Sequence, residues 1–203
     1  MTVRVKICGV TGVEDAEAAI LAGADLIGLN FYRPSPRYLD RDSARAIRRV
    51  IGRRAQVVGV FVNEARSVIG DRVQELRLDL LQFHGDEEES ALSGWALPVI
   101  RALRVRTGEA LVAISRTHAD YVLLDTFSSV LYGGSGVARP LEELKQLDLS
   151  RVFISGGLNA TNVAAAAAHG PYAVDAASGV ESTPGVKDHL KLRSFVANAK
   201  SAR

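Results

Sequence analysis

The stretch VRVKICGVTGVEDAEAAILAGADLIGLNF, residues 3–31, decides the fold class. It begins with a short β-rich run at residues 3–8 and ends with a second one at residues 25–31. Between them, residues 14–22 have helical composition and are followed by Gly23, a residue type that often terminates helices. Two short apolar strands that flank one helix predict a βαβ unit with parallel strands.

The same alternation continues along the whole chain. Further β-rich runs occupy residues 56–62, 78–83, 98–105, 120–125, 151–155 and 172–178. Helix-like segments occupy residues 43–51, 64–76, 86–95, 108–115, 141–147, an Ala-rich stretch from an Asn159 N-cap to His169–Gly170, and about 187–199. Eight strand–helix units predict an α/β protein with a single (β/α)8 TIM barrel domain over residues 1–203. A doubly wound open sheet is the alternative that the units alone leave open.

The composition excludes several classes of protein. The chain has 203 residues, of which 47% are hydrophobic, and 25 basic residues nearly balance 23 acidic ones. This balance excludes extended disorder and gives no support for nucleic acid or an anionic membrane as a partner. The single cysteine, Cys8, excludes an intrachain disulfide and a cysteine-based structural zinc site. The chain also has no apolar stretch long enough to span a membrane, so we expect a soluble cytoplasmic protein.

Two strand ends carry candidate acid–base groups. In the first strand the period of two places Val5 and Ile7 on one face and Lys6 and Cys8 on the other, which we expect to point into the barrel. Cys8 then lies at the barrel mouth, unless it is only a small buried apolar residue. Asp125 ends the sixth strand and precedes a long glycine-rich loop rather than a helix, which favours a site residue over a helix cap.

Other loops at the same end carry candidate binding groups. Glycine-rich turns follow the last two strands, where barrels often bind phosphate through backbone N–H groups. Arg37 lies in the proline-rich loop at residues 31–38, where its guanidinium group could bind a carboxylate through two hydrogen bonds. The alternative is that it is a surface arginine in a proline turn. His84 follows the fourth strand and can line the mouth. The histidines show no metal-ligand spacing, and no P-loop or GxGxxG turn supports nucleotide binding.

Seven segments in order carry a family resemblance. They are KICGVT at residues 6–11, FYRPSPRY at 31–38, VGVFVN at 58–63, LLQFHGDE at 80–87, LLDT with GGSG at 123–126 and 133–136, SGGLN at 155–159, and DAASGVES with PGVKD at 175–188. Together they make the chain resemble the phosphoribosylanthranilate isomerases of tryptophan biosynthesis, over essentially its whole length.

The resemblance implies an activity and a set of site residues. It implies an Amadori rearrangement of N-(5′-phosphoribosyl)anthranilate, a small-molecule substrate, without cofactor or metal, by a monomer or a homodimer. Asp125 would be the general acid, Cys8 the general base, and Arg37 the group that holds the anthranilate carboxylate. The phosphate would be held, and the site lined, by residues of several loops. The residues expected to bind the phosphate are Gly134, Ser135, Gly136, Gly156, Gly157, Ser178 and Gly179. The residues expected to line the site are Lys6, His84 and Asp175.

The chain departs from the family pattern at three places. Residues 137–140 replace an aromatic segment that commonly follows the loop-six glycines, Ala160 replaces a proline, and Ala176–Ala177 replace a Val-Ser pair. Other readings also remain open at this point. They are another phosphosugar barrel enzyme, such as indole-3-glycerol-phosphate synthase or a ribulose-phosphate epimerase, and a non-catalytic phosphometabolite-binding barrel.

Overall fold

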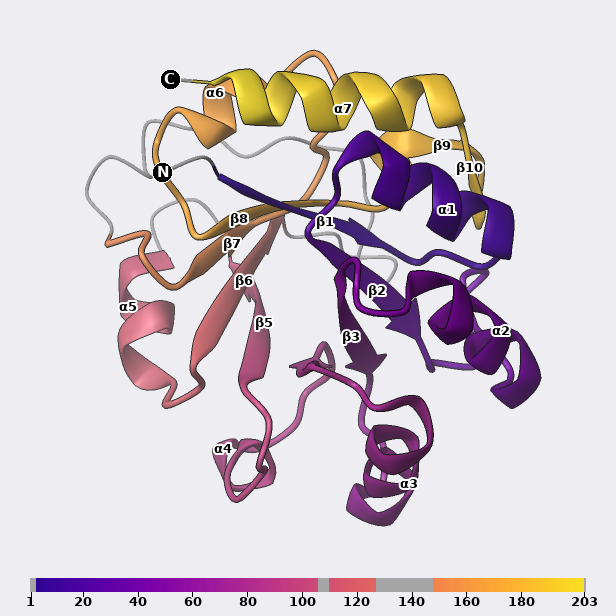
Figure 1. Cartoon of the computed structure of the whole chain (residues 1–203). Coiled ribbons are helices and arrows are strands. Elements are labelled where there is room, and N and C mark those ends of the chain that lie inside the picture. Colours follow the sequence, from indigo (N-terminus) through magenta and orange to yellow (C-terminus); the bar gives the residue numbers. More distant parts are fainter. Residues whose placement is uncertain (1–2, 106–109, 127–147, 203) are drawn as a thin grey trace.

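Eight parallel strands close into a barrel in the computed structural model, which describes residues 3–105, 110–126 and 148–202 (Figure 1). The closure joins β8 to β1, with Lys6 opposite Asp175. The predicted (β/α)8 barrel is therefore confirmed, and the open sheet is excluded. The strands are β1 (Arg4–Cys8), β2 (Leu26–Asn30), β3 (Gln56–Phe61), β4 (Leu80–Phe83), β5 (Val99–Val105), β6 (Tyr121–Thr126), β7 (Val152–Ile154) and β8 (Ala173–Ala176).

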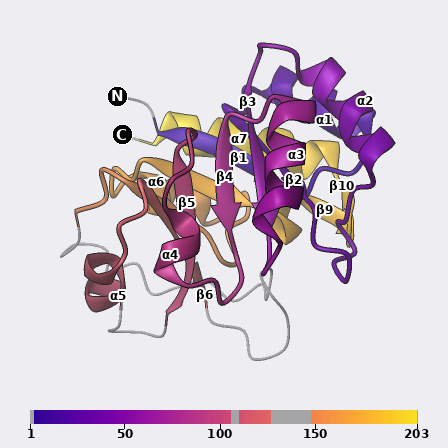
Figure 2. The same cartoon turned by 90° about the horizontal axis from the view of Figure 1, so that it is seen from below.

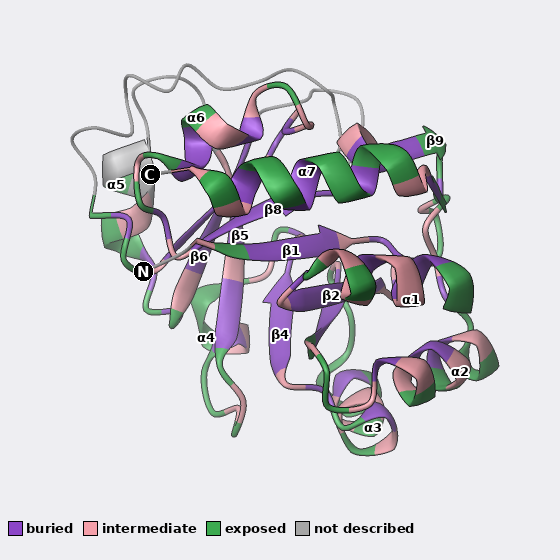
Figure 3. Ribbon diagram, turned by 45° about the horizontal axis from the view of Figure 1, so that its top comes forward, coloured by how far each residue is buried: buried purple, intermediate pink, exposed green. Residues whose placement is uncertain are grey.

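Helices cover the outside of the barrel. They are α1 (Val13–Ala22), α2 (Arg41–Ile51), α3 (Arg66–Leu76), α4 (Glu89–Leu92), α5 (Ala110–Arg116), α6 (Val163–Ala167) and α7 (His189–Ser201). Helices α1, α2 and α3 lie side by side, and α7 packs on α1 (Figure 2). Figure 3 shows that α7 turns a buried face to the barrel and an exposed face to solvent. Within the described ranges no helix is both long and apolar enough to cross a membrane.

The alternation of side chains along the strands builds two apolar layers. Val5 and Ile7 are fully buried in the layer between strands and helices, as predicted for that face of β1. A second cluster fills the barrel interior, with Leu26, Leu123 and Phe153 among its members. Lys6 points to this inner side and is wholly buried. The inner face of β1 therefore delivers polar groups to the barrel, because each strand residue faces opposite its neighbours.

Aspartates that precede the strands fix the other end of the barrel. Asp25, Asp79 and Asp120 each accept a hydrogen bond from a backbone N–H in the preceding strand, namely Val5, Val57 and Val99, at 2.7–2.8 Å. Such a bond satisfies a strand-end donor and fixes the register of neighbouring strands. This end of the barrel therefore has a stabilising function, which leaves the opposite end for loops that carry a site.

Two predicted helices differ from the structure. The segment 86–95 forms only the short helix α4, because Glu87 accepts the N–H of Gly85 and pairs with Arg101, which holds residues 86–88 in a loop. Asn159 does not cap α6, whose N-cap is Asn162. The Asn159 side chain instead accepts the N–H of Thr161 in the preceding turn.

The chain after β8 also contains elements that the sequence did not predict. A short 3-10 helix, η2 (Ser178–Val180), leads into an antiparallel hairpin of β9 (Glu181–Thr183) and β10 (Val186–Lys187). Helix α7 then begins two residues later than expected, with Asp188 as its N-cap. The predicted helix at residues 141–147 lies outside the described residues.

Candidate active site

A pocket lies at the carboxyl ends of the strands, where barrel enzymes place their chemistry. Its lining includes five of the residues singled out from the sequence: Cys8, Arg37, His84, Asp125 and Asp175. These residues come from β1, the loop between β2 and α2, the end of β4, β6 and β8. Neutral residues complete the described lining: Asn30, Tyr32, Ser35, Val60, Val62, Gln82, Ser155 and Ala177. The fold therefore brings a thiol, two carboxyl groups, an imidazole and a guanidinium group around one cavity.

Cys8 ends β1 directly opposite Gly28 of β2. A Cβ atom added to Gly28 would lie 2.9 Å from the Cys8 sulfur, so only glycine leaves room for this thiol. Burial raises the pKa of the Cys8 thiol, and the charges of Lys6 and Lys187 oppose that rise. Burial therefore disfavours the thiolate, and the two ammonium groups favour it.

Lys6 lies beneath Cys8 in a buried ion pair. Its Nζ is 2.8 Å from Oδ1 of Asp175, and the Ser155 hydroxyl donates to the other carboxylate oxygen at 3.0 Å. Burial alone would lower the pKa of Lys6, but Asp175 and Cys8 outweigh it and raise that pKa. Lys6 therefore stays an ammonium group, and it supplies a fixed positive charge under the thiol.

Asp125 lies beside His84 in the lining of the pocket. The Nε2 atom of His84 lies 3.4 Å from Oδ2 of Asp125, and the carboxyl group is almost completely buried. Nδ1 of the same imidazole is 2.9 Å from the Gln82 amide nitrogen. Because that amide nitrogen donates, Nδ1 accepts, and a neutral His84 carries its proton on Nε2, toward Asp125. The carboxyl group thus has a proton-bearing neighbour on the pocket side.

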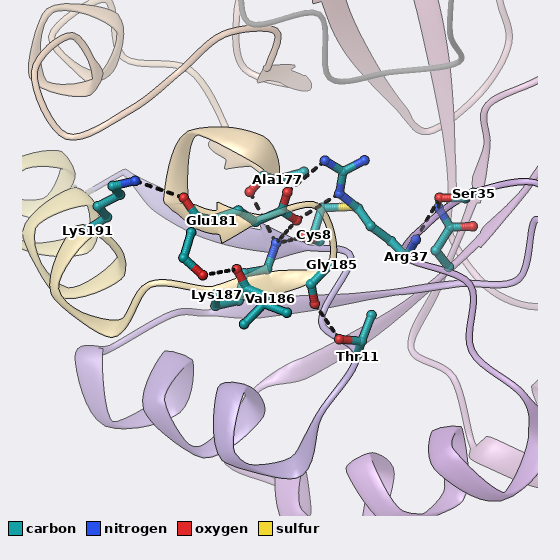
Figure 4. A network of polar contacts seen from close by, with 12 residues as sticks. Cys8, Thr11, Ser35, Arg37, Ala177, Glu181, Gly185, Val186, Lys187 and Lys191 are labelled. Carbon is teal, nitrogen blue, oxygen red and sulfur yellow. Dashed lines mark hydrogen bonds and ion pairs between the residues drawn. The ribbon is translucent and has the colours of Figure 1, made fainter.

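Arg37 is held by a network that the sequence did not predict (Figure 4). Its Nε and Nη2 donate to the two carboxylate oxygens of Glu181, each at 2.8 Å. Lys187 Nζ donates to the same carboxylate at 2.9 Å and to the backbone oxygen of Cys8 at 2.7 Å. Arg37 is therefore not the solvated surface arginine that was the alternative, but a half-buried and oriented one.

The loops that follow β7 and β8 are in contact with each other beside this network. Gly156 and Gly157 have φ angles of 84° and 69°, which L side chains rarely adopt. A Cβ atom on Gly179 would lie 1.9 Å from the Leu158 backbone oxygen, so glycine is needed where the two loops meet. Ser178 and Gly179 open η2 at this junction. Four of the predicted phosphate-binding residues are thus close together, and Gly134, Ser135 and Gly136, with residues 137–140, lie outside the described residues.

Sequence reasoning missed Glu181, Lys187 and the structural glycines Gly28 and Gly9. Glu181 and Lys187 both belong to the DAASGVES–PGVKD segment, but their spacing carries no motif. Arg37, the partner of Glu181, is 144 residues away from it in the sequence. Within the described ranges, no group of three or more His, Cys, Asp or Glu residues is arranged to hold a metal ion.

Comparisons with known proteins find one family over nearly the whole chain. The sequence model of N-(5′-phosphoribosyl)anthranilate isomerase matches residues 5–198. An isomerase of that name from Pseudomonas fluorescens is 44% identical over 197 residues, covering 96% of this chain and 97% of the relative. Another from Myxococcus xanthus is 47% identical over 209 residues, covering 99% and 98%.

Solved structures agree with the sequence relatives. The phosphoribosyl anthranilate isomerase of Thermus thermophilus superimposes with a TM-score of 0.88 at 37% identity, covering 98% of this chain and all of that one. A second isomerase structure, with a TM-score of 0.81, 37% identity and 98% coverage of both chains, holds reduced 1-(o-carboxyphenylamino)-1-deoxyribulose 5-phosphate. A third structure is of monomers generated from the dimeric isomerase of Thermotoga maritima, and it superimposes with a TM-score of 0.82 at 35% identity and 98% coverage of both chains.

Proposed function

The chain belongs to the N-(5′-phosphoribosyl)anthranilate isomerase family of tryptophan biosynthesis, and we propose that Asp125 and Cys8 are the acid and the base of its isomerisation. The reaction converts N-(5′-phosphoribosyl)anthranilate into 1-(2-carboxyphenylamino)-1-deoxyribulose 5-phosphate. The single observation that carries the proposal is the pocket that Cys8, Asp125 and Arg37 line together. A sugar bound there is flanked by a thiol and a carboxyl group on different strands.

The first step opens the ribose ring. Asp125 gives its proton to the ring oxygen, the bond from that oxygen to C1′ breaks, and the anilino nitrogen supplies the electron pair that forms a Schiff base. Asp125 stands at the end of β6 with its nearly buried carboxyl group in the lining of the pocket, where a bound sugar would meet it. His84, with Nε2 at 3.4 Å, can bring a proton back to the carboxylate.

The second step moves a proton from carbon. The Cys8 thiolate removes the C2′ proton, the electrons of that bond form a C1′–C2′ double bond, and the iminium nitrogen becomes an amine. The resulting enolamine then tautomerises to the ketone of the product. The thiolate is needed only at this stage, and the ammonium groups of Lys6 and Lys187 favour it. The positive charge of the iminium ion, present only after ring opening, favours it further.

Two further groups hold the ends of the substrate. Arg37 binds the anthranilate carboxylate. This assignment is supported by the position of its own guanidinium group, which lines the pocket and is held in one orientation by Glu181. The backbone N–H groups of Gly156, Gly157, Ser178 and Gly179, with Gly134, Ser135 and Gly136 from loop six, bind the phosphate. Supporting this assignment, the loops that carry the first four are in contact at Gly179. Holding both ends places the sugar between acid and base.

Kinetics on single variants test the assignment. The substrate is formed in situ, and loss of its anthranilate-type fluorescence is followed for wild type, Cys8→Ala and Asp125→Asn, each with a circular dichroism spectrum. We expect each variant to fold and to lose about 10²–10⁴-fold in kcat. The control Asp42→Asn changes an exposed carboxylate on α2 and should keep wild-type rates. A wild-type kcat in either site variant removes that residue from its assigned step.

A further inference from the structure

Arg37 shares its positive charge with a carboxylate of its own chain. The Glu181 carboxylate accepts hydrogen bonds from Nε and Nη2 of Arg37 in a side-on pair, with both distances at 2.8 Å. A guanidinium has five N–H groups, so the two of Nη1 and the second one of Nη2 remain. Those three make no hydrogen bond within the described part of the chain. The end of the fork therefore stays available to a second carboxylate, but its charge is already neutralised by Glu181.

Lys187 restores the missing charge. Its Nζ is fully buried and donates to Glu181 Oε1 at 2.9 Å, to Cys8 O at 2.7 Å and to Ala177 O at 3.1 Å. Burial lowers the pKa of Lys187, and the Glu181 carboxylate opposes that fall. The three acceptors require three N–H groups, which an ammonium group has and a neutral amine does not, so the geometry favours the charged form. Arg37, Glu181 and Lys187 thus sum to one positive charge, which we call the clamp cluster.

The hairpin fixes this cluster against the thiol strand. The turn residue Gly185 has a φ of 89°, and its carbonyl accepts a hydrogen bond from Thr11 just after β1. A Cβ atom on Gly185 would lie 2.8 Å from the Pro36 backbone oxygen, so the hairpin turn also packs directly against the loop that carries Arg37. The hairpin therefore packs against the arginine loop through Gly185 and binds the backbone of Cys8 through Lys187.

We propose that Lys187 is a positioning residue that sets the strength of carboxylate recognition, because it cancels Glu181 and so keeps the clamp cluster net cationic. The proposal rests on the function assigned above to Arg37. Without Lys187, Glu181 neutralises Arg37, and an incoming substrate carboxylate meets a neutral pair. With Lys187, the same carboxylate completes a cluster of two cations and two anions.

The test measures how much the substrate carboxylate contributes to binding. Dissociation constants are measured by calorimetry for reduced 1-(2-carboxyphenylamino)-1-deoxyribulose 5-phosphate and for its analogue without the carboxyl group. Their ratio is the carboxylate discrimination. In wild type a charge-assisted bidentate pair should make this ratio about 10–100. In Arg37→Ala the ratio should fall to near one, and an unchanged ratio would refute the carboxylate role of Arg37 itself, independently of Lys187.

The net charge of the clamp cluster predicts the order of the carboxylate discrimination ratios in three further variants. Lys187→Met should lower the ratio toward that of Arg37→Ala. Glu181→Gln should keep it at or above wild type, because removing the anion leaves the cluster cationic. The double variant Lys187→Met/Glu181→Gln should recover most of what Lys187→Met loses. The matched control Glu17→Gln, which breaks a bidentate pair with Arg54 on the surface, should leave the ratio unchanged.

Two results would overturn the role of Lys187 while leaving the clamp intact. One is a wild-type ratio in folded Lys187→Met when Arg37→Ala has lost discrimination. The other is a low ratio in Glu181→Gln, which would mean that orientation of Arg37, and not net charge, controls recognition. If Lys187→Met does not fold, the Glu181→Gln and double variants still test the role, because they differ only in the charge of Lys187 and neither leaves a buried carboxylate without its cation. The proposal expects the higher ratio in Glu181→Gln, and equal ratios in the two variants would overturn it.

Discussion

Gly9 is the position at which one added methyl group should disturb the carboxylate clamp. The residue follows Cys8 and has a φ of 67°. A Cβ atom built on it would lie 2.4 Å from Cδ of Arg37, and 3.1 Å from Cγ. The arginine stem cannot move aside freely, because its guanidinium is held by two hydrogen bonds to Glu181. Gly9→Ala must therefore strain the backbone, displace Arg37, or do both.

The magnitude follows from those two costs. A left-handed conformation costs a residue with a Cβ atom about 1–2 kcal/mol. Overpacking against a held side chain costs about 1–3 kcal/mol. The sum is about 2–5 kcal/mol, and at about 2–4 °C per kcal/mol for a chain of this size the melting temperature should fall by about 4–20 °C. Displacement of Arg37 should raise KM by a larger factor than it lowers kcat.

Thermal unfolding and steady-state kinetics check both numbers. The matched control is Gly70→Ala, in α3, where an added Cβ atom has no neighbour within 4 Å. That change should stabilise the helix by about 0.5–1 kcal/mol and leave KM unchanged. If Gly9→Ala melts at the wild-type temperature with a wild-type KM, the close approach between Gly9 and Arg37 does not exist in solution.

Three other predictions concern different parts of the molecule. Gly179→Ala should lower stability by about 1–3 kcal/mol or more and raise KM, measured by thermal melts and kinetics, because its methyl group would meet the backbone oxygen of Leu158. Since burial raises the pKa of the Cys8 thiol and the thiolate is the base, kcat/KM should still be rising with pH at the ordinary thiol pKa, and Lys6→Met should shift this rise to higher pH. A pH profile that is flat across this range, or one that Lys6→Met does not shift, would contradict the assignment of Cys8 as the base. Asp188→Ala should cost about 1 kcal/mol, seen as a fall of about 2–4 °C in the melting temperature with unchanged kcat, because the carboxylate caps α7 through two backbone N–H groups.

The sequence predicts the barrel well because patterns among neighbouring residues determine where each strand and helix forms. Each strand is a short apolar run, each is followed by a helical segment or a glycine-rich loop, and the period of two in β1 correctly assigns Val5 to the helix side and Lys6 to the interior. Strand ends then indicate where Cys8 and Asp125 lie, since parallel strands of a barrel end on one side. These features need only neighbouring residues to be recognised.

The clamp cluster could not be predicted in the same way. Glu181 and Lys187 come together with Arg37 only after β8 pairs with β1 and the hairpin folds back over the arginine loop. The short α4 has the same cause, because the Glu87–Arg101 ion pair depends on β5 lying beside β4. Where tertiary contacts choose the local structure, helix propensity alone gives the wrong length.

The division of labour between Asp125 and Cys8 is tested most directly by a kinetic isotope effect. Substrate that carries deuterium at C2′ is compared with ordinary substrate in wild type, Cys8→Ser and Asp125→Asn. A weakened base makes proton abstraction from C2′ rate-limiting, so Cys8→Ser should show a full primary isotope effect. A missing acid makes ring opening rate-limiting, so Asp125→Asn should show none. The opposite pattern, with the isotope effect in Asp125→Asn and none in Cys8→Ser, would contradict the assignment of acid and base.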